Sequence, residues 1–148
     1  MNGSNFRSQL RTNVPGHTVV TGRFVDTAGG TGASTAITIV EGKKFLVERT
    51  ATGAYKVTFG TSSTNLTPVK GVISITANAI VATPGTAANN RHIQVLSILN
   101  TAGTAWANGD ALASVTLSTV DKDGAVASLT ANDGLAFNFI VRDTEILV

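Results

Sequence analysis

Apolar and polar residues alternate with a period of two along most of this 148-residue chain. Such a period places successive side chains on opposite faces of a strand. No segment shows the 3.6-residue period of an amphipathic helix, and turn residues separate the alternating runs. We therefore predict an all-β fold, an antiparallel β-sandwich or barrel-like domain of about eight or nine strands. The predicted strands cover residues 17–25, 36–40, 43–49, 55–60, 71–82, 91–99, 111–120, 125–129 and 134–143.

The clearest hairpin is KKFLVERTATGAYKVTFG, residues 43–60. Its turn contains Gly53, which we expect to adopt a positive φ angle. A second tight turn is expected at residues 121–124, again with a glycine where positive φ is favoured. The alternation also predicts which side chains face the core. These are Val20, Gly22, Phe24, Phe45, Val47, Tyr55, Val57, Phe59, Ile73, Ile75, Ala77, Ile93, Val95, Leu99, Leu135, Phe137, Phe139 and Val141.

Residues 1–16 differ from the rest of the chain because they are polar and contain no acidic residue. We predict a flexible N-terminal arm over 1–16 and a single β-sandwich domain over 17–148. The arm is interpreted either as a frayed terminus or as a segment that orders against an acidic or assembled neighbour. The second interpretation makes Phe6, Arg7 and Arg11 candidate partner-binding residues. The first residues lack an apolar segment, so we do not expect a signal peptide.

The composition favours a protein that lies against neighbours in an assembly. Only 14% of the residues are charged, against about 25% in typical soluble domains, and threonine and alanine are abundant. The net charge of +2 is too small to indicate nucleic-acid binding. The sequence contains no run of about 18 apolar residues, so we do not expect a membrane span. The chain has no cysteine, which excludes disulfides and thiolate chemistry.

The sequence contains few candidates for catalysis or metal binding. His17 and His92 each begin a predicted strand, and neither belongs to a metal-binding spacing. Asp121 and Asp123, with Asp133 further along, have the oxygen ligands that calcium needs, but an ordinary hairpin turn explains them better. No catalytic motif occurs. We therefore predict no enzymatic activity, no cofactor and no metal.

Two further features have alternative interpretations. Trp106 lies in a turn rich in alanine, asparagine and glycine, and it is a candidate anchor for a partner. It is equally expected to fold back and close one end of the sandwich. Glu48 and Arg49 are candidates for cross-strand pairs against Lys56, which would add only tenths of a kcal/mol.

Four stretches together resemble small structural proteins of tailed bacteriophages, the virion proteins that decorate or cement the capsid shell. They are GKKFLVERTATGAYKVTFG, GVISITANAIVATPG, RHIQVLSIL and DKDGAVASLTANDGLAFNFIVRD. The resemblance covers about residues 17–143, with a TGAY-V-F turn and an ANDG…F-F strand as its markers. It implies a β-sandwich, often a homotrimer, bound to the outer face of a capsid. It does not identify the residues that bind.

The expected function is therefore that of a capsid decoration protein on the virion surface, made in the cytoplasm of the host bacterium. Its expected partners are the major capsid protein and further copies of itself, with no role for nucleic acid or membrane. The alternative is a receptor- or glycan-binding module of a phage head fibre or tail. In that case Trp106, Tyr55 and the polar loops 26–35, 61–68 and 83–90 would form the binding surface.

Overall fold

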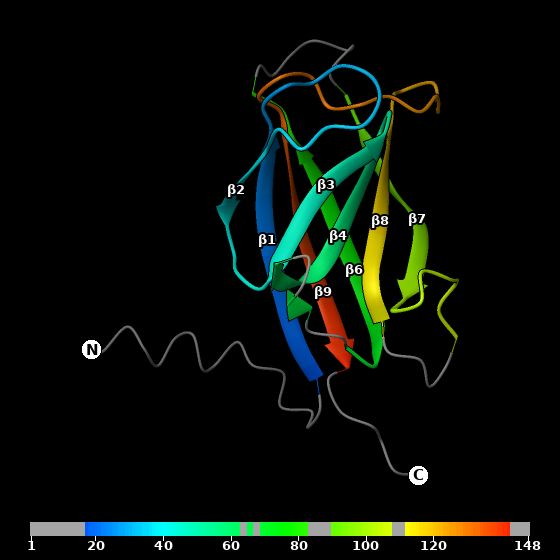
Figure 1. Ribbon diagram of the computed structural model, residues 1–148. Helices are drawn as coiled ribbons and strands as arrows, with labels where there is room; N and C mark the ends of the chain where they lie inside the picture. Colours follow the sequence, from blue (N-terminus) through cyan, green and yellow to red (C-terminus); the bar gives the residue numbers. More distant parts are fainter. Residues whose placement is uncertain (1–16, 63–64, 67–68, 83–89, 108–111, 143–148) are drawn as a thin grey trace, which may run out of the picture.

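The protein folds into two antiparallel β-sheets that pack face to face (Figure 1). This computed structural model describes residues 17–62, 65–66, 69–82, 90–107 and 112–142. The strands are β1 (His17–Asp26), β2 (Ile37–Glu41), β3 (Phe45–Ala51), β4 (Ala54–Ser62), β5 (Asn65–Leu66), β6 (Gly71–Ile80), β7 (His92–Asn100), β8 (Leu112–Val120) and β9 (Gly134–Arg142). The described ranges contain no helix. The predicted all-β fold is confirmed, and the two sheets make it a sandwich.

The strand order defines two sides and two ends of the sandwich. One sheet has the order β2-β1-β9-β6, and the other has the order β3-β4-β8-β7, with the short β5 beside β4. The edge strands β2 and β3 therefore lie on one side, and β6 and β7 lie on the other (Figure 1). β1 begins opposite Arg142 of β9 and finishes near Gly134. We call the end where β1 finishes the Asp26 end, which is uppermost in Figure 1.

The core lies between the sheets and is dominated by aromatic rings. On β9, Leu135, Phe137, Phe139 and Val141 are all buried, as the alternation predicted. Phe137 stacks on Phe139 with ring centroids 4.6 Å apart, and Phe45 packs edge-on against Phe137 at 4.9 Å. Such aromatic pairs stabilise a core beyond the area that they bury. The inward faces predicted for β1, β3 and β4 are also confirmed.

The predicted inward face of β6 is wrong at Ile73. β6 pairs with β9 through a register shift between Val72 and Ser74, so Ile73 is the extra residue of a β-bulge. A bulge of one residue moves the following side chains to the opposite face. Val72 and Ile75 therefore both pack against the core, whereas Ile73 is exposed.

The predicted inward face of β7 is wrong at Val95, which precedes a bulge. Its register against β8 shifts between Val95 and Ser97, which makes Leu96 the extra residue. Ile93 and Ile98 pack against the core on either side of this bulge. Val95, which we predicted to face inward, is exposed.

Residues 125–129 do not form the predicted strand. The segment makes one isolated bridge, between Val120 and Val126, and then leaves the sheet. The N–H of Ala127 donates to the Thr119 carbonyl of β8 at 3.0 Å, and side chains bond further backbone groups of the segment. The Thr119 hydroxyl donates to the carbonyl of Ala127 at 2.6 Å, and the N–H of Leu129 donates to the hydroxyl of Tyr55 at 3.0 Å. The segment therefore crosses the Asp26 end rather than extending the sheet.

Both predicted tight turns are confirmed, because Gly53 and Gly124 have φ angles of 64° and 83°. The predicted pair between Glu48 and Lys56 is also confirmed, with 3.0 Å between Oε1 and Nζ. Arg49 does not join this pair. Its side chain points into the Asp26 end instead, where it contacts Asp26.

Candidate functional site

The Asp26 end contains a buried ionic cluster that closes the core. Asp26 is the last residue of β1, and its carboxylate is fully buried. One oxygen, Oδ1, accepts the N–H groups of Ala28 and Gly29 at 3.2 and 2.9 Å. The other, Oδ2, lies 2.5 Å from the Arg49 guanidinium and accepts the Tyr55 hydroxyl at 2.8 Å. We call Asp26, Arg49 and Tyr55 the Asp26 brace.

Each member of the Asp26 brace connects a different part of the fold. Arg49 and Tyr55 lie opposite each other on β3 and β4. The Nε of Arg49 also donates to the carbonyl of Gly32 at 2.8 Å, which fixes the loop after β1. The Tyr55 hydroxyl accepts the N–H of Leu129, from the segment that crosses this end. The brace therefore joins both sheets and both covering segments through charge-assisted hydrogen bonds.

The geometry of the brace suits a structural role. A carboxylate with two oxygens has about four acceptor positions, and four donors surround Asp26. Burial raises the pKa of Tyr55 to about 12, and the hydroxyl consequently stays protonated and remains a donor to Asp26. A general base must reach the proton that it abstracts from a substrate. Asp26 is enclosed and already engaged, so it meets no substrate.

The raised pKa of Tyr55 predicts a loss of stability at high pH. The tyrosine of the unfolded chain ionises near pH 10, whereas Tyr55 holds its proton to about pH 12 in the folded protein. The unfolded state therefore loses its proton first, and the free energy of unfolding falls between about pH 10 and about pH 12. Denaturant titrations across this range measure that fall.

Tyr55→Phe is the control for this pH dependence, because lysines titrate in both proteins and only the tyrosine differs. Its free energy of unfolding should fall less over the same range. Tyr55 is the single tyrosine of the chain, so tyrosinate absorbance of the native protein reports its pKa directly. Ionisation near pH 10 in the native protein, or equal pH dependence of the two proteins, would contradict the expectation.

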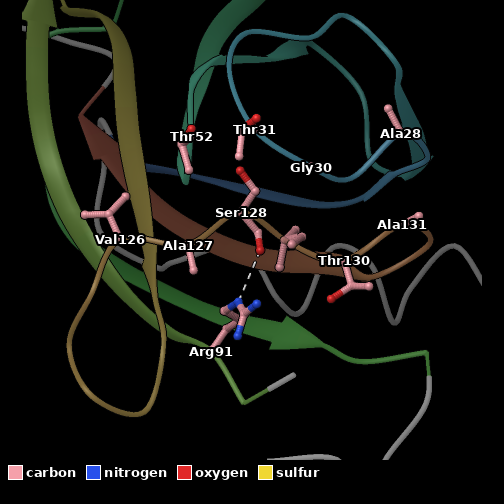
Figure 2. Close-up of a pocket in the computed structure, with 11 residues that line it drawn as sticks. Ala28, Gly30, Thr31, Thr52, Arg91, Val126, Ala127, Ser128, Thr130 and Ala131 are labelled. Atoms are coloured by element: carbon pink, nitrogen blue, oxygen red, sulfur yellow. Dashed lines mark hydrogen bonds between the residues drawn. The ribbon is translucent and has the colours of Figure 1, made fainter. Parts of the chain in front are cut away.

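Next to the brace, the covering segments leave an open hollow of about 560 Å³ on the surface (Figure 2). Its polar groups are three threonine hydroxyls, one buried serine and one arginine. Figure 2 shows Thr31 and Thr52 on one side and Arg91 on the other, with Ser128 between them. Arg91 Nε donates to the Ser128 carbonyl at 3.2 Å, and the Ser128 hydroxyl accepts the N–H of Gly53 at 2.8 Å.

The lining limits what this hollow does chemically. Its described residues include no carboxylate, imidazole or aromatic ring. General acid–base catalysis uses histidine or carboxylates in most enzymes, and recognition of a sugar by stacking needs an aromatic ring. What remains is hydrogen bonding by hydroxyls and a guanidinium that is already held by the Ser128 carbonyl. The hollow is therefore a shallow surface feature beside the structural brace.

Trp106 lies at the opposite end of the sandwich and closes the core there. Its side chain is partly buried against the core residues, and its backbone N–H donates to the Ile98 carbonyl at 2.9 Å. A Cβ added at Gly71 would lie 3.2 Å from the Trp106 ring, so the ring covers the start of β6. Of the two interpretations of Trp106, the geometry supports closure of the sandwich. Phe6, Arg7 and Arg11 lie outside the described residues.

The aspartates considered as calcium ligands have separate structural partners. Asp121 Oδ1 accepts the N–H groups of Asp123 and Ala125, both at 2.9 Å, and the bond from Ala125 lowers the pKa of Asp121. Asp133 is buried elsewhere and accepts the N–H of Ala82. Within the described ranges, no three histidine or acidic side chains gather as metal ligands would.

The sequence analysis did not identify the Asp26 brace. The signal was present in the alternation that predicted the core. Asp26 continues the inward series of Val20, Gly22 and Phe24, and Arg49 continues the inward series of its own strand. Two opposite charges on core-facing positions indicate a buried ion pair, because an isolated buried charge is very costly.

The part of the chain that the structure describes has no helix long and apolar enough to cross a membrane. No known protein family, curated protein or solved structure matches this chain.

Proposed function

We propose that this chain is a non-enzymatic structural protein of a bacteriophage virion, which binds the outer surface of the assembled capsid as a decoration or cement protein. The position of the exposed apolar side chains carries the proposal. Among the described residues, six large hydrophobic side chains are exposed, and five of them lie on edge strands. They are Ile39 and Val40 on β2, Ile73 on β6, and Val95 and Leu96 on β7.

Edge strands are the parts of a sandwich that another chain reaches most easily, and soluble proteins usually protect them with charged side chains. Exposed apolar groups with polar surroundings are typical of protein contact surfaces. Only 14% of this chain is charged, and one of its ion pairs is used inside the fold. A rigid, lightly charged sandwich with apolar edges fits a protein that works by contact with neighbours.

The proposed mechanism is mass action on the capsid. A protein that binds only the expanded, assembled shell stabilises that shell by its binding free energy. A homotrimer at a local symmetry axis would contact several copies of the major capsid protein at once and gain affinity from multivalency. The protein would be made in the cytoplasm of the host bacterium and function on the virion surface, without binding nucleic acid or a membrane.

Co-sedimentation tests this proposal directly. Expanded capsids are assembled from the major capsid protein encoded in the same genome and mixed with the purified chain. We expect the full chain to pellet with the capsids at a fixed ratio that saturates. We expect a variant that lacks residues 2–16 to pellet much less, because the predicted arm would order on the capsid.

A variant in which Phe6, Arg7 and Arg11 are replaced by serine keeps the length of the arm and serves as its matched control. It should bind as poorly as the deletion if these side chains make the contact, and as well as the full chain if they do not. Co-sedimentation with unexpanded shells, compared with expanded capsids, measures how strongly the chain prefers the expanded form. The absence of saturable binding by the full chain would refute the proposal, and glycan binding would then be tested instead.

A further inference from the structure

The chain contains two Asp-Gly pairs, and the fold places them in opposite surroundings. Asp123 and Gly124 lie in the turn that follows β8, whereas Asp133 and Gly134 lie where β9 begins. An aspartate followed by glycine can react with its own backbone, because attack by the next nitrogen on the side-chain carboxyl closes a five-membered ring. Glycine has no Cβ to hinder that attack. The surroundings of each pair then decide whether the ring forms.

The first pair has the freedom that ring closure needs. The side chain of Asp123 is 71% exposed. Its ion pair with Lys122 is also at the surface, and such a pair holds a side chain only weakly. A Cβ added at Gly124 would meet no other atom within 4 Å, so there is open space beside the reacting nitrogen. The Gly124 N–H bonds to the Asp121 carbonyl at 3.1 Å, in a turn where water can replace that bond.

The second pair is held on every side. Asp133 is 2% exposed, and its Oδ1 accepts the N–H of Ala82 at 2.8 Å. Gly134 begins a central strand, with partners on both β1 and β6. A Cβ added at Gly134 would lie 2.5 Å from the Phe24 carbonyl oxygen, so the backbone has no space to rearrange. Ring closure at Asp133 therefore requires this end of β9 to open.

We propose that Asp123 is a self-modification site, at which the chain converts aspartate to isoaspartate through a succinimide, while the fold protects Asp133. The Gly124 nitrogen forms a bond to Cγ of Asp123, and the carboxyl hydroxyl leaves as water with the amide proton. Water then opens the ring at one of its two carbonyl groups. Attack at Cγ restores aspartate, and attack at the backbone carbonyl leaves Gly124 attached through Cγ. Water is the only other reactant.

Isoaspartate would lengthen the backbone of the turn by one methylene group. Asp121 closes this turn, because its N–H donates to the Ala125 carbonyl at 2.9 Å. Its Oδ1 accepts the N–H groups of Asp123 and Ala125. The added carbon lies between these two donors, so they cannot both keep their positions on Oδ1. We expect amide exchange at Ala125 to become faster in the modified protein.

The test follows the unmodified full chain during prolonged storage at neutral pH in water enriched in oxygen-18. Each ring opening adds one oxygen atom from water, so the reaction labels the residue even where aspartate is restored. Tryptic peptides that end at Arg142 contain both Asp-Gly pairs, and electron-transfer fragmentation assigns the label and the isoaspartate to one residue. We expect both to accumulate at Asp123 at least about tenfold faster than at Asp133, because Asp133 reacts only after local opening.

Storage of the same chain in denaturant is the matched control, because it removes the fold and keeps both local sequences. The two rates should then approach each other. Asp123→Glu keeps the charge beside Lys122 but would need a larger ring, so label at residue 123 should disappear. Equal rates at Asp123 and Asp133 in the folded protein, or no label at Asp123, would overturn the proposal. A difference that persists in denaturant would overturn protection by the fold. The proposal does not depend on capsid binding.

Discussion

Asp26→Ala is expected to lower the free energy of unfolding by about 3–5 kcal/mol, because it leaves the Arg49 guanidinium buried without its counterion. The loss would be a large part of the roughly 5–15 kcal/mol that stabilises a typical domain. The substitution also removes the acceptor of Tyr55 and of the N–H groups of Ala28 and Gly29. Denaturant unfolding followed by circular dichroism measures the loss.

Glu48→Ala is the matched control for Asp26→Ala, since it also breaks an ion pair that includes a residue of β3. The Glu48–Lys56 pair is partly exposed to solvent, so its loss should cost less than about 1 kcal/mol. The double variant Asp26→Leu with Arg49→Met should be more stable than Asp26→Ala alone, because neither charge remains to be desolvated. An Asp26→Ala variant no less stable than Glu48→Ala would contradict the role of the brace.

Alternation predicted the strands and the core well wherever the register is unbroken. The inward residues of β9 were all identified, as were Tyr55, Val57 and Phe59 of β4. These strands lie inside the sheets, where each pairs with neighbours on both sides. Burial of one face then fixes the register, because a slip of one residue would expose every core side chain.

The predicted inward faces were wrong in β6 and β7, which are edge strands of their sheets. An edge strand has one partner, so it tolerates an extra residue that a central strand would not. Nothing in the composition of β6 distinguishes Ile73 from Ile75, and only the pairing with β9 shows that Ile73 is the extra residue. The bulges at Ile73 and Leu96 were therefore not predictable from a period of two.

The site was only partly predictable from the sequence, and for a different reason. Tyr55 was expected to face the core, and it does, but its hydroxyl bonds Asp26 from the other sheet. Pairing between sheets depends on how the two layers are placed, which alternation within one strand does not determine. Arg49 was therefore considered only with its neighbour Lys56, whereas its partner lies 23 residues away in the chain.

Phe137→Ala is expected to cost about 3–5 kcal/mol, as do other truncations of buried phenylalanine. Phe137 lies on a central strand and contacts the rings of both Phe45 and Phe139. It is also directly opposite Gly22 of β1. A Cβ at Gly22 would lie 2.5 Å from the Phe137 ring and would overlap Phe45. Gly22→Ala should therefore overpack the core and cost about 1–3 kcal/mol.

The two substitutions should compensate for each other, and this coupling is the sharper test of the packing. In a Phe137→Ala background, Phe45 has room to move, and the methyl group that Gly22→Ala adds fills part of the cavity. A strand glycine is also less favourable than alanine by about 0.5–1 kcal/mol. In this background Gly22→Ala should be neutral or stabilising, so the destabilisation that it causes in the unmodified protein should disappear or change sign. Phe137→Leu can replace Phe137→Ala in this double-mutant cycle and should lower the free energy of unfolding less. Gly71→Ala, which approaches Trp106 instead, should have the same effect in both backgrounds. Strictly additive effects at Gly22 and Phe137 would show that these rings do not occupy the space above Gly22.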